Sequence, residues 1–322
     1  MSLSFKDLRM AAIGECMLEL SGLPQSGDKY TLQLGFGGDT LNTALYAARL
    51  GVSTHYVTAL GDDPRSQWLI RQWHKEQIQT DWVFKLADRQ PGLYWITTDS
   101  AGERSFAYWR GEAAARELFD SAERAVAVTE ALATVGLVYL SGITLSLYAP
   151  ESLERLWTML ATLKERGVIL AFDGNYRPRG WLRSEDARSA FLRAASLCHI
   201  ALPTFEDEVM LFGDASEDAT IDRWLSQGVQ ELVLKRGERG CVVATREQQT
   251  SVPIPSSVQV IDTTAAGDSF NAAYLSGRLA GHAPVVAADF GNRLAGSVIA
   301  HRGAIIPKAA MPAFDLWSRD SS

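Results

Sequence analysis

Nine consecutive residues, 262–270, combine the residue types that a phosphoryl-transfer site needs. Ala265, Ala266 and Gly267 have a methyl side chain or none, so a phosphate group could come close to the backbone. The apolar pattern that follows predicts a helix that begins near Gly267, and the amides of its first turn would point at that phosphate. Asp268 would repel a bound phosphate. A carboxylate at this position therefore indicates a base that accepts the proton of an attacking hydroxyl.

A plainer interpretation of Asp268 stays open, because a first-turn aspartate also complements the helix dipole. The nine-residue context favours the base. The segment before it contains Val258, Val260 and Ile261, and this apolar pattern predicts the end of a buried strand.

A second glycine-rich stretch, residues 35–42, offers groups that could bind a hydroxylated ligand. Asp39 and Asn42 lie three positions apart at the start of a predicted helix that ends at Gly51, so both can face one ligand. Alternatively, Asp39 or Thr40 only caps this helix. The glycine spacing does not match the G-x-G-x-x-G of dinucleotide-binding folds.

Two strand-like runs, 93–98 and 104–110, flank a predicted turn at 99–102. Strand alternation places Arg104, Phe106, Tyr108 and Arg110 on one face. Two arginines and a tyrosine suit a pocket for an anion, or else a face in contact with solvent.

From residue 117 onward helical and strand patterns alternate, which predicts a parallel sheet with helices on both faces. The strand at 168–172 runs into residues 173–178, at the sheet edge where such folds bind ligands. Arg177 precedes a proline and is therefore biased away from a helix, free to reach a ligand. Lys235 ends another strand, before a turn with Gly237 and Gly240, and could equally be an ordinary strand-end lysine.

Composition limits the possible classes of protein. The 322 residues are 47% hydrophobic and 21% charged, as in a globular protein with a substantial core. The net charge of −7 argues against a nucleic-acid or anionic-membrane surface. The three cysteines and five histidines form no metal or disulfide pattern, and no apolar run is long enough for a membrane span. We expect a cytoplasmic enzyme or binding protein.

These motifs resemble those of the PfkB (ribokinase-like) carbohydrate kinases. Residues 262–268 match the D-T-x-G-A-G-D motif, residues 37–42 match G-G-x-x-x-N, residues 173–178 match D-x-N-x-R-P, and residues 235–240 match K-x-G-x-x-G. Ala265 stands where many members have glycine, so we expect no positive φ there. The resemblance runs from Gly14 to about Pro307 and is strongest to the 2-keto-3-deoxygluconate kinases of that family.

The resemblance implies an α/β fold: a Rossmann-like, ribokinase-type, mostly parallel sheet flanked by helices, with a small β-sheet lid. Residues 1–322 would form a single catalytic domain, with lid strands inserted at about 15–36 and 91–111. The implied reaction transfers the ATP γ-phosphoryl group to the C6 hydroxyl of 2-keto-3-deoxygluconate. The implied partners are this sugar acid, ATP and further copies of the chain in a homo-oligomer. Three alternatives stay open: a kinase of a neutral sugar such as fructose or ribose, an NAD-dependent dehydrogenase, and an inactive sugar-binding protein.

The resemblance also assigns roles to individual residues. Asp268 would be the base, beside an anion hole formed by the amides of residues 265–268. The substrate would contact Gly38, Asp39, Asn42, Tyr94, Arg104, Tyr108, Arg110 and Arg177, although the counterpart of Arg177 can instead face the nucleotide. The nucleotide would contact Asn175, Lys235, Gly237, Gly240 and Asn292.

The implied cofactors are ATP and Mg²⁺, with a monovalent cation such as K⁺ left open. The N-x-x-E motif that handles magnesium through water is replaced here by Thr204 and Asp207. Asp207 is therefore the metal candidate, and Glu208 competes with it. Glu206 suits an acidic first helical turn equally well.

Overall fold

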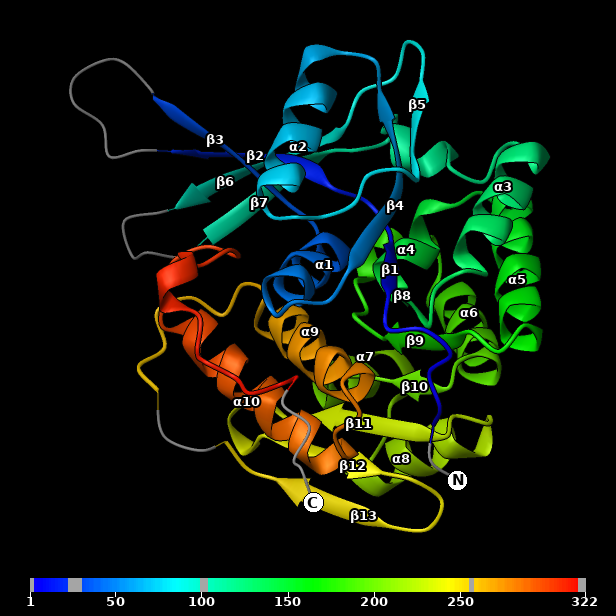
Figure 1. Cartoon of the computed structure of the whole chain (residues 1–322), viewed down its shortest axis with the longest axis vertical. Helices are drawn as coiled ribbons and strands as arrows, with labels where there is room; N and C mark the ends of the chain where they lie inside the picture. The colour runs from blue at the N-terminus through cyan, green and yellow to red at the C-terminus, as the bar shows by residue number, and fades with distance from the viewer. Residues whose placement is uncertain (1–2, 23–30, 99–103, 255–257, 318–322) are drawn as a thin grey trace.

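Two β-sheets organise the described part of the chain in this computed structural model, which covers residues 3–22, 31–98, 104–254 and 258–317 (Figure 1). The large sheet contains, in order across it, β13 (Gln249–Val252), β12 (Cys241–Ala244), β11 (Glu231–Lys235), β10 (Ile200–Ala201), β9 (Ile169–Asp173), β8 (Leu137–Ser141), β1 (Met10–Ile13), β4 (Thr54–Gly61) and β5 (Val83–Leu86). All neighbouring pairs are parallel except β11–β12 and β12–β13. The expected mostly parallel α/β sheet is confirmed.

Helices cover both faces of this sheet and give the protein two apolar cores. One face carries α1 (Asp39–Arg49), α2 (Pro64–Lys75), α9 (Ala266–Leu279) and α10 (Pro284–Ile299). The other carries α3 (Ala122–Leu132), α4 (Gly142–Leu147), α5 (Pro150–Glu165), α6 (Ser184–Leu197), α7 (Phe205–Phe212) and α8 (Glu217–Ser226). Short 3-10 turns are η1 (Ala114–Glu117), η2 (Pro178–Gly180), η3 (Gly237–Arg239) and η4 (Lys308–Ala310). Because both faces are covered, the central strands are apolar throughout instead of alternating.

The small sheet has the strand order β3 (Leu32–Gly37), β2 (Met17–Gly22), β6 (Gly92–Thr98) and β7 (Arg104–Trp109). It projects from one edge of the main body, above the start of α1 (Figure 1). The register sets Tyr94 beside both Glu19 and Tyr108. We call this sheet the lid. The turn predicted at 99–102 and the side chain of Arg104 lie outside the described residues.

The prediction of a strand before the phosphate loop is wrong. Residues 258–261 are irregular, and the side chains of Val260 and Ile261 are 59% and 51% exposed. The backbone amides of Ile261 and Asp262 donate to the Ile299 carbonyl oxygen, at 2.8 and 3.2 Å. These two bonds hold the segment against the end of α10, so its β-branched residues have no strand partner. The helix after the loop begins at Ala266, one residue before the predicted start.

Candidate active site

The phosphate loop turns sharply at Ala265, directly before α9. This residue adopts the left-handed conformation, with φ of +60°. Our expectation that alanine excludes a positive φ is therefore wrong. The conformation costs a non-glycine residue about 1–2 kcal/mol, and neighbouring bonds hold it: Ser269 N donates to Ala265 O at 2.9 Å, and Thr264 N to Asp262 Oδ1 at 3.0 Å. The Ala266 amide donates to Thr263 O at 3.2 Å, so the first-turn amides left for an anion are those of Gly267 and Asp268.

Asp268 lies in the first turn of α9, where it meets the start of α1. Asn42 Nδ2 donates to Asp268 Oδ2 at 2.8 Å, and Thr43 Oγ1 donates to the Asp268 carbonyl oxygen at 3.1 Å. Within the described residues the other carboxylate oxygen, Oδ1, has no hydrogen-bond partner. Two of the predicted site residues thus lie in direct contact, with one oxygen of Asp268 left for a ligand.

The environment of Asp268 raises the pKa of its carboxyl group to about 8. Burial is the main cause, the neighbouring carboxylates of Asp39 and Asp173 add to it, and the Asn42 amide and Lys235 oppose it. A pKa near the operating pH suits a general base, because the group then both accepts and releases a proton readily.

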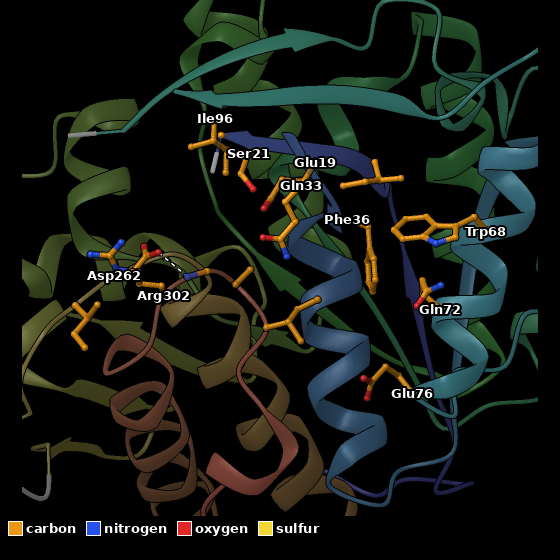
Figure 2. A pocket seen from close by; sticks show the side chains of 17 residues that line it. Glu19, Ser21, Gln33, Phe36, Trp68, Gln72, Glu76, Ile96, Asp262 and Arg302 are labelled. Carbon is orange, nitrogen blue, oxygen red and sulfur yellow. Dashed lines mark hydrogen bonds between the residues drawn. The ribbon is translucent and has the colours of Figure 1, made fainter. Parts of the chain in front are cut away.

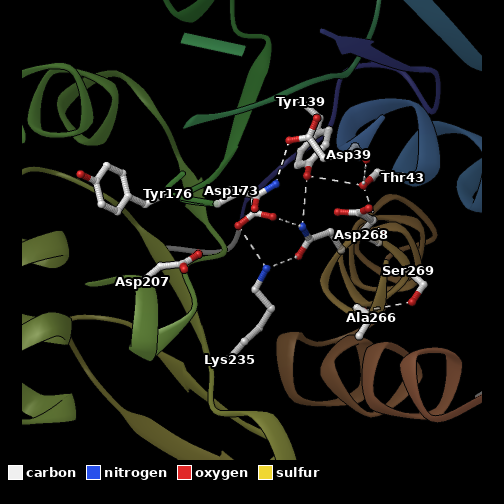
Figure 3. A network of polar contacts seen from close by, with 12 residues as sticks. Asp39, Thr43, Tyr139, Asp173, Tyr176, Asp207, Lys235, Ala266, Asp268 and Ser269 are labelled. Carbon is white, nitrogen blue, oxygen red and sulfur yellow. Dashed lines mark hydrogen bonds and ion pairs between the residues drawn. The ribbon is translucent and has the colours of Figure 1, made fainter. Parts of the chain in front are cut away.

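Lys235 lies at the centre of a buried polar network (Figure 3). Its Nζ donates to Asp173 Oδ1 at 3.1 Å and to Asn271 Oδ1 at 3.2 Å, and Asn271 Nδ2 donates to Asp173 Oδ2 at 2.7 Å. A Cβ atom built on Gly267 would stand 3.4 Å from Lys235 Nζ. Lys235 is therefore next to the phosphate loop, not an ordinary strand-end lysine in solvent.

Asp39 faces the same network from the start of α1. Asn175 Nδ2 donates to Asp39 Oδ2 at 2.9 Å. Burial raises the pKa of Asp39, while hydrogen bonds from Ser141 and Asn175 lower it. Gly38 is the N-cap residue of α1 and Asp39 is the first helical residue. A backbone hydrogen bond from Thr40 also lowers the pKa of Asp39, so the interpretation of Asp39 as a group that binds first-turn amides stays open. Asn175, which we expected on the nucleotide side, lies beside Asp39.

Gly38 is required by close packing. A Cβ atom built there would stand 2.2 Å from the Glu15 carbonyl oxygen. Its φ of 171° is ordinary extended backbone, so the constraint is space and not conformation.

The lid contributes aromatic side chains from one of its faces. Tyr94 donates its hydroxyl hydrogen to Glu19 Oε2, and the Tyr94 and Tyr108 ring centroids are 6.1 Å apart. Tyr108 also stacks on Phe106, with centroids 6.3 Å apart, and remains 47% exposed. The predicted shared face is thus present for Phe106 and Tyr108, and Glu19 joins it.

Arg110, just after β7, forms an ion pair with the buried Glu15 at the end of β1. We predicted a pocket for an anion or a solvent-facing strand face at Arg110, and neither interpretation included this carboxylate partner. The pairing could not be seen in the sequence, because 95 residues separate the two positions and only the fold brings them together.

A cavity of about 790 Å³ lies beneath the lid (Figure 2). Glu19, Ser21 and Gln33 line it from the lid, and Trp68 and Gln72 from α2. Asp262, Arg302 and the backbone around Gly303 form the opposite wall, where Gly303 N donates to Asp262 Oδ2 at 2.8 Å. The cavity thus borders the phosphate loop on one side and Glu19 and Ile96 of the lid on the other.

The two metal candidates, Asp207 and Glu208, both lie in the acidic first turn of α7 but have different surroundings. Asp207 lies near the network, and Arg177 Nη1 is 3.4 Å from both of its carboxylate oxygens. Glu208 is fully buried on the far side, where Arg223 Nη2 and Trp224 Nε1 donate to Oε2 at 2.7 and 2.9 Å. Glu208 therefore holds α7 to α8, and Asp207 is the one placed toward the site. Burial raises the pKa of both carboxyl groups, that of Glu208 to about 7.

Comparison with known proteins places this geometry in a family. Residues 7–311 match the model of the pfkB family carbohydrate kinases. The chain belongs to this family. The 2-dehydro-3-deoxygluconokinase of Escherichia coli K12 is 44% identical over 313 residues, which are 95% of this chain and 99% of that protein. The enzyme of the same name from Dickeya dadantii is 45% identical over 312 residues, 94% of this chain and 98% of that one.

Solved structures of the PfkB family share the fold. A fructokinase from Xylella fastidiosa with bound ATP superposes with a TM-score of 0.80 at 23% identity, covering 95% of each chain. An aminoimidazole riboside kinase from Salmonella enterica gives a TM-score of 0.76 at 20% identity, covering 94% of this chain and 96% of that one. Family membership removes the dehydrogenase alternative.

The residues expected at the PfkB nucleotide side lie around β11, β12 and α10. Gly237 and Gly240 have φ of +57° and +73°, and a Cβ atom on Gly240 would stand 2.2 Å from the Val252 carbonyl oxygen. Asn292 Nδ2 donates to the carbonyl oxygens of Val252 and Pro253, each at 3.2 Å. These contacts shape the turn, and the predicted contact with adenine stays a prediction.

Sequence reasoning missed five residues that the fold brings to the site: Glu15, Glu19, Thr43, Asp173 and Asn271. One signal was available for Glu15 and Asp173, since each lies at the carboxyl end of a central strand, where open α/β sheets place ligand-binding groups. Thr43 and Asn271 follow Asn42 and Asp268 on the same helices and offered no signal of their own.

Proposed function

We propose that this chain is an ATP-dependent kinase of 2-keto-3-deoxygluconate, also named 2-dehydro-3-deoxygluconate, that phosphorylates its C6 hydroxyl. Enzymes named for this reaction are 39–45% identical to the chain over most of its length. The observation that carries the proposal is the Asp268 carboxylate, held by Asn42 at the mouth of the phosphate loop with one oxygen unused. The presence of this group also argues against an inactive sugar-binding protein.

The proposed chemistry is a single in-line displacement. Asp268 Oδ1 accepts the proton of the C6 hydroxyl as its oxygen forms a bond to the γ-phosphorus of ATP. The bond between that phosphorus and the β,γ-bridging oxygen breaks, and its electron pair leaves with ADP. The amides of Gly267 and Asp268 hold the charge on the transferred group.

Lys235 gives the site its local positive charge. It balances the carboxylates of Asp39, Asp173 and Asp268, which would otherwise repel the phosphates of ATP. Described residues form no cluster of three or more acidic, cysteine or histidine side chains suited to a metal. This fits Mg²⁺, which keeps several waters and binds mainly through substrate phosphates, with Asp207 as its contact through water. When bound, the ion would neutralise phosphate charge.

The acid group of the substrate would bind between lid and core. Arg110 would bind the acid from the base of the lid, with Tyr94 and Tyr108 on the same sheet, and Asp39 and Asn42 would contact the hydroxyls. Arg104 and Arg177 stay further candidates, Arg177 at the edge near Asp207. Arg110 would bind the acid through the guanidinium donors that Glu15 does not use, and a neutral sugar offers those donors no negative charge, so the acid is favoured over fructose or ribose.

Residues 1–322 would form one catalytic domain, whose lid excludes water during transfer. The lid face opposite Tyr94 carries Leu34 and Trp109, which are 45% and 58% exposed. Burying such residues against another copy would stabilise the predicted homo-oligomer. In the described ranges, no helix has both the length and the apolar character to cross a bilayer. A cytoplasmic location and K⁺ dependence stay predictions from the resemblance.

The test is a side-by-side assay of 2-keto-3-deoxygluconate, fructose and ribose with ATP and Mg²⁺. We expect kcat/KM to be highest for the sugar acid, and the product phosphate to sit on C6 by NMR. Better turnover of fructose or ribose would overturn the sugar-acid proposal while leaving a PfkB sugar kinase.

A further inference from the structure

The Glu15–Arg110 pair joins the core to the lid. Glu15 follows β1, at the carboxyl edge of the large sheet, and its side chain is 1% exposed. Arg110 follows β7, the outer strand of the lid, and its side chain is 25% exposed. The two ion-paired atoms are Glu15 Oε2 and Arg110 Nη2.

The chain makes room for this pair. Gly92 begins β6 between the two partners, and a Cβ atom built there would stand 2.8 Å from Glu15 Oε1 and 3.2 Å from Arg110 Cβ. Any larger residue at position 92 would push the lid strand away from Glu15. The glycine therefore lets the guanidinium lie against a carboxylate that belongs to the core.

The pair is also incomplete as it stands. Apart from their ion contact, both Glu15 oxygens and Arg110 Nε and Nη2 are buried without a regular hydrogen bond in the described part of the chain. Burying charged groups without hydrogen bonds is costly. A guanidinium has five N–H donors in a flat fork, so one carboxylate can hold Nη2 while Nη1, which is not among these buried atoms, stays available.

We propose that Glu15 is a positioning residue: it fixes the Arg110 guanidinium at the base of the lid so that the remaining donors face the carboxylate of the sugar acid. This inference rests on the proposed function and deepens it. Without Glu15, Arg110 would be a flexible side chain that must be ordered by each substrate. With Glu15, that ordering is complete before the acid binds, which favours acids over neutral sugars.

The matched acceptor for the test is 3-deoxyfructose, which has the same carbon chain with a hydroxymethyl group in place of the carboxylate. The measured quantity is the acid preference, meaning kcat/KM for 2-keto-3-deoxygluconate divided by kcat/KM for 3-deoxyfructose. The variants are Glu15→Gln, Arg110→Gln and the double variant. Glu117→Gln is the control, because Glu117 forms a partly exposed ion pair with Arg89 that includes neither Glu15 nor Arg110.

We expect Glu15→Gln to lower the acid preference about 10-fold, mainly through KM for the acid, with KM for ATP little changed. Arg110→Gln should lower it by about 10- to 100-fold, as expected for loss of a charged hydrogen bond. The double variant should be no worse than Arg110→Gln, because Glu15 acts through Arg110. Glu117→Gln should keep the preference of the wild type.

A Glu15→Gln enzyme whose two kcat/KM values fall equally would overturn the proposal, since a merely structural role affects both acceptors alike. Additive losses in the double variant would overturn it as well. A wild-type enzyme that does not phosphorylate 2-keto-3-deoxygluconate would instead contradict the proposed function, so the two failures are distinguishable.

Discussion

Asn42 Nδ2 lies 2.8 Å from Asp268 Oδ2 and joins residues 226 positions apart in the chain. The bond ties the first turn of α1 to the first turn of α9 and fixes the orientation of the carboxylate. Because the amide occupies Oδ2, the acceptor hydroxyl has Oδ1. In the proposed function, Asn42 would therefore couple sugar binding to the position of the base.

Replacing Asp268 with Asn should lower kcat by about 10²–10⁴-fold, the usual effect of removing a general base. Asparagine keeps the shape of aspartate but cannot accept the proton. Binding of ATP, measured by calorimetry, should persist. Asp289→Asn, on the exposed face of α10, is the matched control and should keep normal kcat. Near-normal turnover of the Asp268 variant would show that another group takes the proton.

The pH dependence of kcat/KM should show the titration of Asp268 in the free enzyme. The active form is the carboxylate and its pKa is raised to about 8, so kcat/KM should rise with pH below that value and level off above it. The nearby carboxylates titrate together, so the midpoint belongs to the group as a whole. An acid limb near pH 4 would contradict this assignment.

Asn42→Ala tests the same titration from the other side of the hydrogen bond. The Asn42 amide lowers the pKa of Asp268. Its removal should move the acid limb of the profile to higher pH, in addition to weakening acceptor binding. A variant with a raised KM and an unmoved limb would mean that Asn42 contacts the sugar without influencing the base.

Glycine at positions 265 and 266 should change stability in opposite directions. Ala265 has a positive φ, which costs alanine about 1–2 kcal/mol, so Ala265→Gly should raise the melting temperature by about 1–3 °C. Ala266 is helical, so Ala266→Gly should lower the free energy of unfolding by about 0.5–1 kcal/mol, and the melting temperature should fall with it. Equal shifts in calorimetry would mean that the left-handed turn carries no strain.

The other end of α9 is held by a buried ion pair. Arg278 Nε and Nη2 donate to the two Glu231 oxygens, each at 2.9 Å, with side chains 6% and 5% exposed. Arg278→Met leaves a buried carboxylate unpaired and should cost about 3–5 kcal/mol in urea unfolding. Arg193→Met breaks the exposed Arg193–Glu154 pair, 45% and 62% exposed, and should cost about 0–1 kcal/mol. Similar losses would show that burial does not set the cost.

Most of the architecture could be predicted because its signals are local. Alternating apolar strand and helix patterns specified the parallel sheet, and residues 262–270 located the loop–helix junction within one residue. The strand predicted at 258–261 failed for a physical reason. A β-branched apolar run forms a strand only beside a partner, and here the partner is the end of α10.

The sequence predicted which residues belong to the candidate site, but not which of them contact one another. The proximity of Asp39 and Asp268 follows from two helix starts that meet at one sheet edge. The raised pKa of Asp268 and the Glu15–Arg110 pair depend on burial and on neighbours far along the chain, which no local pattern encodes. The positive φ of Ala265 depends on the bonds around it, because alanine alone disfavours that conformation.

The contact between α1 and α9 has a consequence for biosynthesis. Asn42 emerges from the ribosome early and Asp268 more than two hundred residues later. Tyr46 of α1 likewise donates to Ala304 O at 2.7 Å and accepts from Ile306 N at 3.1 Å. Until those residues are translated, the side of α1 that packs against α9 has no cover, and the nascent chain depends on protection from aggregation. Phosphoryl transfer can therefore begin only after nearly the whole polypeptide has been released.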